Sequence, residues 1–275
     1  MASTLSPMNT STLAFIGGGN MASAILGGLI RSGVAADSLL VVEPHAPQRD
    51  KLRSELGIEA LAAADDSLAN ASLAVWAVKP QVFGEAAAAC GGRLAAALQL
   101  SIMAGVRCDA IAAASGSARV VRAMPNTPAL IGRGITGLYA MSAVTTAECA
   151  RVEQVLAPTG STVWVDREAD LDAVTALSGS GPAYVFYFIE AMVQAGTEMG
   201  LAPETARQLA QETFAGAAAL AMASSESPEV LRERVTSKGG TTHAAIASME
   251  AGGVKAAFVR ALLAARARAE ELGRA

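Results

Sequence analysis

The chain has 275 residues, a formal net charge of −4 and a hydrophobic fraction of 52%, a length that favours two ordinary domains. Alanine supplies 62 residues, but enough larger apolar residues remain to build a core, so composition excludes disordered and fibrous proteins. The negative charge argues against a nucleic-acid partner, because such proteins usually carry a basic face.

The start of the chain and its longest apolar stretch were considered for targeting or membrane insertion. Residues 1–12 lack positive charges and an apolar centre, so we expect a short disordered start and not a secretory signal. Residues 173–189 are uncharged but too short for a membrane span, and a Ser-Gly-Ser-Gly-Pro motif interrupts them. We therefore expect a soluble, cytoplasmic protein.

The cysteines and histidines do not suggest a metal site. Cys90, Cys108 and Cys149 have no paired spacing and lie in apolar surroundings, so we expect buried free thiols. His45 and His243 are the only histidines, which is too few for a histidine-rich metal site. No metal is predicted.

The first part of the chain alternates between strand-like and helical patterns. Apolar runs typical of buried parallel strands cover residues 12–16, 39–42, 73–78, 98–103 and 119–124. Helical spacing follows the first two runs at residues 21–30 and 47–56. This alternation predicts an α/β fold with a Rossmann-type doubly wound sheet, which binds ligands at the carboxyl ends of its strands. We assign residues 1–168 to a dinucleotide-binding domain.

The pattern changes after a last strand-like run at residues 163–165. No strand-like alternation appears from Asp172 onward, and helical segments are predicted at residues 183–199, 203–224, 228–235 and 253–272. The first of these is apolar around most of its circumference, which indicates burial on several sides and pairing with a second copy. We assign residues 169–275 to an all-α dimerisation and substrate-binding domain.

A glycine motif follows the first predicted strand. Gly17-Gly18-Gly19-Asn20-Met21-Ala22 fits the G-x-G-x-x-G/A pattern that lets a pyrophosphate approach a helix N-terminus. Glu43 ends the second strand, where a carboxylate accepts hydrogen bonds from the adenosine ribose and favours NADH. His45 and Arg49 are close enough in sequence to meet a 2′-phosphate instead, so the choice between NADH and NADPH stays open.

Three further strand ends carry candidate cofactor-binding residues. Ala77-Val78-Lys79-Pro80 closes the third strand and Met103-Ala104-Gly105 the fourth, at the edge expected for the nicotinamide and its ribose. After the fifth strand, two prolines present Asn126 from a rigid loop. Lys79 is one of only four lysines and is also a catalytic candidate. A solvated lysine and a plain structural turn remain alternatives for these positions.

Two loops of the C-terminal half precede predicted helices. They are Ser178-Gly179-Ser180-Gly181-Pro182 and Ser237-Lys238-Gly239-Gly240-Thr241-Thr242. Helix N-termini attract anions because unpaired N–H groups and the helix dipole both favour negative charge. Two such loops beside a dinucleotide fold favour a substrate carboxylate, with Ser178 and Gly239 among the candidates, although ordinary capping would explain either loop alone.

These motifs together resemble the pyrroline-5-carboxylate reductase family. The similarity runs from about Leu13 to the C-terminus through six motifs in the family's order: GGGNM, AVKP, MAG, RAMPNTPA, SGSGPAY and SKGGTT. The resemblance implies reduction of Δ1-pyrroline-5-carboxylate to L-proline, the last step of proline biosynthesis, with NADPH or NADH. It also implies a homodimer through the C-terminal helices, with dimers assembling further, commonly into pentamers of dimers.

The resemblance also implies roles for individual residues. The loop around Ser237, Gly240, Thr241 and Thr242 would grip the substrate carboxylate, and the Thr242 hydroxyl would face the ring nitrogen. Two positions depart from the family's pattern. Lys238 stands where many members carry proline. Glu43 replaces the small polar or basic residue often seen where NADPH is preferred, and a carboxylate there would repel a 2′-phosphate.

Two other functions are alternatives to the reductase. A β-hydroxyacid dehydrogenase shares the two-domain plan, but its family places a catalytic lysine on a helix after its glycine-rich loop, and residues 183–199 contain none. A non-catalytic regulatory protein that binds a dinucleotide or pyridoxal phosphate would make the loops at Ser178 and Ser237 superfluous. The sequence therefore favours the reductase.

Overall fold

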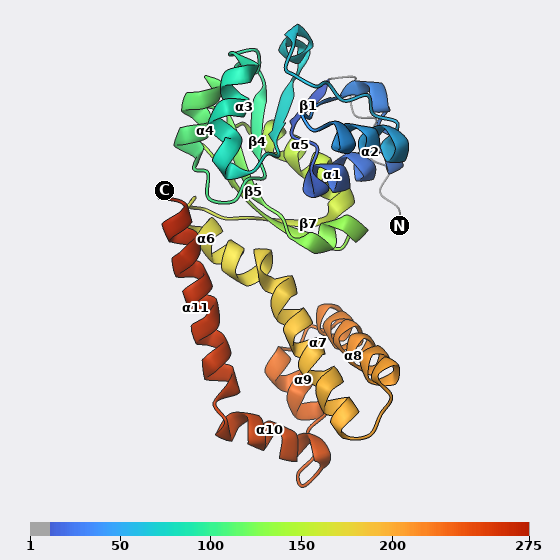
Figure 1. Ribbon diagram of the computed structural model, residues 1–275. Helices are drawn as coiled ribbons and strands as arrows, with labels where there is room; N and C mark the ends of the chain where they lie inside the picture. Colours follow the sequence, from blue (N-terminus) through green and yellow to red (C-terminus); the bar gives the residue numbers. More distant parts are fainter. Residues whose placement is uncertain (1–11, 275) are drawn as a thin grey trace. The chain divides into compact units, whose positions relative to one another are not determined.

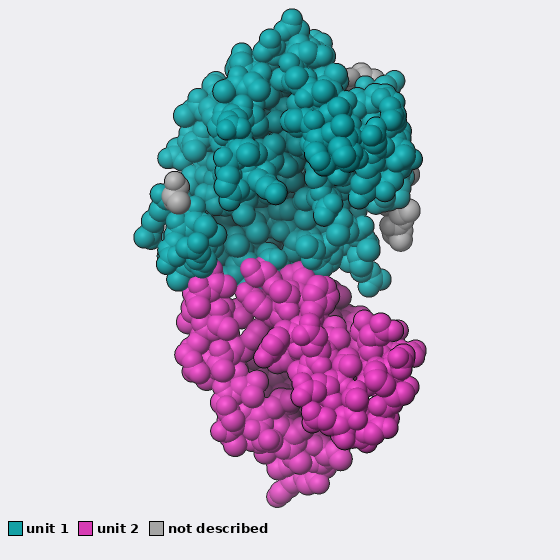
Figure 2. Space-filling view, in the orientation of Figure 1, with its two compact units in different colours: residues 1–179, 266–275 teal, residues 180–265 magenta. Residues whose placement is uncertain are grey.

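The computed structural model describes residues 12–274. The chain divides into two compact units, residues 1–179 with 266–275 and residues 180–265 (Figure 2). The disordered start expected for residues 1–12 lies outside the described residues, apart from Thr12. The domain boundary after residue 168 stays a prediction, since compactness groups residues 169–179 with the first unit. In the part of the chain that the structure describes, no helix is long and apolar enough to cross a membrane.

The first unit is built on a sheet (Figure 1), whose strands among the described residues follow the order β2-β1-β3-β4-β5-β6-β7. The strands are β1 (Leu13–Ile16), β2 (Leu39–Val42), β3 (Leu73–Trp76), β4 (Leu98–Ser101), β5 (Val120–Met124), β6 (Gly134–Ala140) and β7 (Gly160–Trp164). Strands β1 to β5 are parallel, and β1 pairs with both β2 and β3. The strand order therefore reverses at β1, the kind of position where such sheets bind ligands.

Helices cover both faces of this sheet, which is why its parallel strands are short and apolar. Helices α1 (Asn20–Arg31), α2 (Ala46–Leu56) and α5 (Thr146–Leu156) share one buried cluster with strand residues such as Phe15. Helices α3 (Phe83–Cys90) and α4 (Cys108–Ser115) share the other cluster with residues such as Trp76. The predicted Rossmann-type sheet is confirmed.

The remaining elements of the first unit are short. Helix α6 (Asp170–Val174) leads into a π-helical turn at Thr175–Gly179. Single 3-10 turns lie at Ala36–Ser38, Asp66–Asn70, Pro80–Val82, Thr127–Ile131 and Ala157–Thr159.

Strand β6 has no counterpart among the predicted strands, and some predicted strand ends differ from the observed ones. Strand β6 is antiparallel to β5 and parallel to β7, and the predicted run at 163–165 is only the end of β7. Gly137 in β6 is needed for close packing, because a Cβ there would lie 2.6 Å from Cγ1 of Val174. The third and fourth strands end at Trp76 and Ser101, two residues earlier than predicted, so their last predicted residues are loop.

The second unit is helical, as predicted. Its helices are α7 (Gly181–Glu198), α8 (Pro203–Ala223), α9 (Pro228–Arg234), α10 (Thr241–Ala251) and the first part of α11 (Val254–Leu272). Helices α7 and α8 pack closely, because a Cβ on Gly196 would lie only 2.8 Å from that of Ala206. The ring of Phe258 packs edge-on against Tyr184 and Phe188, at centroid distances of 5.7 and 5.5 Å.

Candidate active site

The glycine turn between β1 and α1 has two different kinds of glycine. Gly17 has φ +98°, and a Cβ there would lie 2.7 Å from the carbonyl oxygen of Ala77, so only glycine fits. Gly19 is the N-cap of α1 and has no side chain to accept a hydrogen bond from the first N–H groups, and a Cβ there would meet no atom within 4 Å. The N-terminus of α1 is thus uncapped beside open space, which fits the requirement for a pyrophosphate.

The Glu43 carboxylate is hydrogen-bonded to this turn. Its Oε2 accepts a hydrogen bond from the Gly18 N–H at 2.9 Å, and its Oε1 accepts one from the His45 N–H at 2.9 Å. Gln48 was not a sequence candidate, but its Nε2 donates to the Gly18 carbonyl oxygen at 2.5 Å. Arg49 donates to the carbonyl oxygens of Glu43 and Pro44 at 3.0 and 2.6 Å. The first turn of α2 therefore stabilises the glycine turn.

The other predicted cofactor residues follow β3 and β4. Ala77-Val78-Lys79-Pro80 comes directly after β3, with Lys79 exposed. After β4, Met103 is buried and donates its N–H to Ser101 Oγ at 3.2 Å, and Gly105 has φ +79°. Because β1 to β4 are parallel, these residues lie at the same edge of the sheet as the glycine turn.

Asn126 connects this edge to Ser178. The buried Asn126 side chain accepts a hydrogen bond from the Ile135 N–H at 3.0 Å and donates one to the Ser178 carbonyl oxygen at 3.2 Å. The Ser178 hydroxyl donates to the Val174 carbonyl oxygen at 3.0 Å within the π-helical turn, a rare element often found at functional sites. The structure thus brings Ser178 to the predicted cofactor-binding edge.

A charged cluster lies near the loop after β4 and was not foreseen from the sequence. Glu168 accepts from Arg122 Nη1 and from the Cys108 N–H, both at 2.7 Å, and Arg107 pairs with the buried Asp172 at 2.8 Å. Burial, together with the charge of Glu168, raises the pKa of the Cys108 thiol to about 12. Cys108 is therefore a structural thiol.

The second predicted loop, Ser237–Thr242, lies in the other unit. Gly239 has φ +78°, and the Gly240 N–H donates to the Ser237 carbonyl oxygen at 3.0 Å. A Cβ on Gly240 would lie 2.7 Å from Ser237 Oγ, so glycine permits this tight turn. Gly240 is the N-cap of α10 without a side-chain cap, and Thr242 lies half-buried in the first helical turn. These amides and hydroxyls suit a carboxylate.

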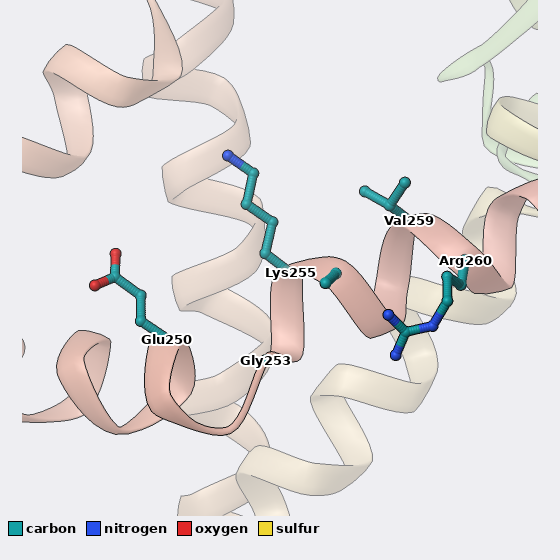
Figure 3. A pocket seen from close by; sticks show the side chains of 6 residues that line it. Glu250, Gly253, Lys255, Val259 and Arg260 are labelled. Carbon is teal, nitrogen blue, oxygen red and sulfur yellow. The ribbon is translucent and has the colours of Figure 1, made fainter.

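A pocket at the turn between α10 and α11 has no arrangement of groups that would hold an anion (Figure 3). Its lining residues are Glu250, Gly253, Lys255, Ala256, Val259 and Arg260. Figure 3 shows the Lys255 and Arg260 side chains pointing in different directions, so they do not converge on one anion. Among residues 12–274 there is also no group of three acidic, histidine or cysteine side chains that could hold a metal ion.

Comparison with known proteins gives the family. The family model described as pyrroline-5-carboxylate reductase dimerisation matches residues 168–272. The family model described as NADP oxidoreductase coenzyme F420-dependent matches residues 12–105. A pyrroline-5-carboxylate reductase from Pseudomonas aeruginosa is 45% identical over 271 residues, covering 96% of this chain and 98% of that protein. One from Pisum sativum is 36% identical, covering 95% and 96%.

Solved structures that match nearly the whole chain share the fold. A pyrroline-5-carboxylate reductase from Coxiella burnetii has a TM-score of 0.87 and 37% identity, covering 96% of this chain and 99% of that chain. A pyrroline carboxylate reductase from Plasmodium falciparum with NADP bound has a TM-score of 0.85 and 28% identity, covering 97% and 99%. Since the similarity spans both units and nearly the full length of each relative, the chain belongs to the pyrroline-5-carboxylate reductase family.

Proposed function

We propose that this protein reduces Δ1-pyrroline-5-carboxylate to L-proline with NADPH or NADH, as the last step of proline biosynthesis in the cytoplasm. The observation that carries the proposal is a pair of helix N-termini with glycine N-caps in a member of this family. Helices α1 and α10 both begin after a glycine N-cap that makes no side-chain hydrogen bond. One fits a pyrophosphate and the other a small carboxylate.

The cofactor is assigned to the edge of the sheet in the first unit. The pyrophosphate would be held by Gly17-Gly18-Gly19-Asn20-Met21 and the adenosine ribose by Glu43. The nicotinamide side would be held by Ala77-Val78-Lys79-Pro80, Met103-Ala104-Gly105 and Asn126. The open space at Gly19 and the rigid support of Glu43 agree with this assignment. A bound reduced nicotinamide supplies the hydride for the imine carbon.

We assign the substrate carboxylate to the loop of the second unit, and Ser178 of the first unit stays a separate candidate for substrate binding. Ser237, Gly239, Gly240, Thr241 and Thr242 would hold it through hydroxyls and the amides of α10. Fixing the carboxylate orients the ring, and orientation of two reactants is by itself a large part of catalysis.

Proton transfer to the substrate does not require a strong acid in the protein. Reduction of the C=N bond adds a hydride at carbon and a proton at nitrogen, and an imine is basic enough to bind that proton near neutral pH. We assign the Thr242 hydroxyl to orient the ring nitrogen or relay the proton. Lys79, exposed at the end of β3, is the second catalytic candidate.

The protein is a homo-oligomer in this proposal, with a dimer formed through the C-terminal helices. Within residues 180–265 the buried apolar side chains are those of Ala206 and Ala210. Large apolar side chains are exposed instead, among them Phe186 (59%), Tyr187 (69%), Leu220 (60%), Met222 (80%) and Leu263 (58%). So much exposed apolar surface is typical of an interface. A second copy of the chain is the partner that the dimerisation family model supports.

Sedimentation velocity at micromolar concentration tests the assembly. A dimer has twice the 27.8 kDa mass of the chain, and a pentamer of dimers has ten times that mass. Either result supports pairing through the helices, and the larger one supports the further assembly that the resemblance implies. A stable monomer would refute both.

The reaction is tested by following the absorbance of NADH and NADPH with Δ1-pyrroline-5-carboxylate present or omitted. Substrate-dependent loss of absorbance and formation of L-proline, identified by chiral chromatography, are expected. A β-hydroxyacid with the oxidised dinucleotides serves as the control for the alternative dehydrogenase and should give no reduction. If the imine causes no loss of absorbance with either dinucleotide, the proposed function is wrong.

A further inference from the structure

The carboxylate of Glu43 is held from two sides by the backbone. The Gly18 N–H donates to one oxygen and the His45 N–H to the other, each at 2.9 Å. Gly18 belongs to the glycine turn and is itself fixed by Gln48, which donates to its carbonyl oxygen. The carboxylate cannot rotate away from the turn without losing both hydrogen bonds, so its negative charge has a fixed position.

Two arginines near this carboxylate contact other protein groups. Arg49, which the sequence offered as a partner for a 2′-phosphate, donates through Nη1 to the carbonyl oxygens of Glu43 and Pro44. Further along α2, Arg53 pairs with Asp50 at 2.7 Å. The described contacts therefore show a carboxylate held by two backbone N–H groups and an arginine whose Nη1 is directed at backbone carbonyl oxygens.

We propose that Glu43 makes this enzyme select NADH over NADPH, an inference that rests on the proposed function. An acidic residue at this position of dinucleotide folds accepts hydrogen bonds from ribose hydroxyls. A 2′-phosphate would replace a donor with a dianion that has only acceptor atoms, and the carboxylate would repel it. Moving the carboxylate aside for the phosphate would break both of its hydrogen bonds to backbone N–H groups.

Equilibrium binding to the full-length protein tests the selection without relying on turnover. Isothermal titration calorimetry of the wild-type protein is expected to give a Kd for NADH at least tenfold below that for NADPH, which is about 1.4 kcal/mol. Glu43→Ala and Glu43→Gln both remove the charge. Both should lower the ratio of the Kd for NADPH to the Kd for NADH at least severalfold. In Glu43→Gln the amide group would place an N–H against one of the two peptide N–H donors, so the turn is also loosened.

A matched control separates local from general electrostatics. Glu55→Gln removes one negative charge as well, at an exposed position in α2, and should leave the Kd ratio unchanged. Melting temperatures of the variants report whether they fold, and the wild-type ratio tests the inference even if a Glu43 variant does not.

The possible failures have different meanings. Equal or tighter binding of NADPH by the wild-type protein, with the imine still reduced, would overturn the selection but not the proposed function. The same ratio in wild type and a folded Glu43→Ala protein would also overturn the role of Glu43. Absence of binding by both dinucleotides would refute the proposed function, and this inference with it.

Discussion

Gly17 and Gly19 lie two residues apart in one turn. We expect alanine at Gly17 to lower the stability of the protein and alanine at Gly19 to weaken dinucleotide binding. At Gly17, φ is +98° and a Cβ would lie 2.7 Å from a backbone carbonyl oxygen of Ala77. The left-handed backbone costs an alanine about 1–2 kcal/mol. The contact with backbone cannot be relieved by side-chain rotation and costs about 1–3 kcal/mol more. Gly17→Ala should therefore destabilise the protein by about 2–5 kcal/mol.

Gly19→Ala is the matched control for stability and the test for binding. Its φ of −65° and ψ of −175° suit any residue, and a Cβ would meet no atom within 4 Å. Alanine is a poorer N-cap than glycine, so the cost in stability should stay below about 1 kcal/mol. The added methyl group would, however, enter the space assigned to the pyrophosphate. The Kd for NADH should rise about tenfold or more, because every 1.4 kcal/mol of lost contact is tenfold.

Thermal unfolding followed by circular dichroism, without dinucleotide, separates the two effects, since a bound ligand would itself raise the melting temperature. Gly17→Ala should lower Tm by about 4–20 °C, and Gly19→Ala by less than about 4 °C. Calorimetric titration with NADH then measures binding by each folded protein. An unchanged Tm for Gly17→Ala would refute the argument from close packing, and unchanged NADH binding by Gly19→Ala would refute the assignment of the open space.

The remaining predictions concern the substrate loop, a thiol and a buried ion pair. Thr242→Ala should lower turnover about 10- to 100-fold, whereas Thr242→Ser should retain most of it; unchanged kinetics in the alanine variant would reject the role of the hydroxyl. Cys108, whose pKa burial raises to about 12, should resist Ellman's reagent at pH 8 in the native protein and react after denaturation, with mass spectrometry locating the label. Arg107→Met should cost about 2–4 kcal/mol in urea unfolding because it leaves Asp172 buried without its partner, and adding Asp172→Asn should recover part of the loss; fully additive losses would contradict this coupling.

The glycine turn and the parallel strands were predictable because both rest on local signals. Buried parallel strands such as β1 read as uninterrupted apolar runs, and Gly17 marks the point where the chain leaves the sheet. Strand β6 gave no such signal. It contains Gly134 and Gly137 and exposes Ile135, and its place depends on pairing with β5 and on the approach of Val174.

The predicted parts of the site likewise rest on local sequence signals, and the unforeseen parts depend on contacts between distant segments. Spacing placed Asn126 at the correct strand end, but the partners of its side chain, Ile135 and Ser178, depend on β6 and the π-helical turn. Gln48 was missed because a glutamine in the first turn of a helix is ordinary until the glycine turn is known to lie beside it. Contacts between segments far apart in sequence decide such roles, and the roles assigned to the site residues stay predictions.

The alanine-rich composition has a structural consequence in the second unit that links its folding to assembly. Small residues such as Gly196 and Ala206 let α7 and α8 approach closely, so this contact buries little large apolar surface. The large side chains lie on other faces, where Phe186 and Met222 are 59% and 80% exposed. In the proposed dimer a second copy covers those faces, and we expect the unit to gain much of its hydrophobic stabilisation there. We therefore expect the stability of this unit to depend on assembly and on protein concentration.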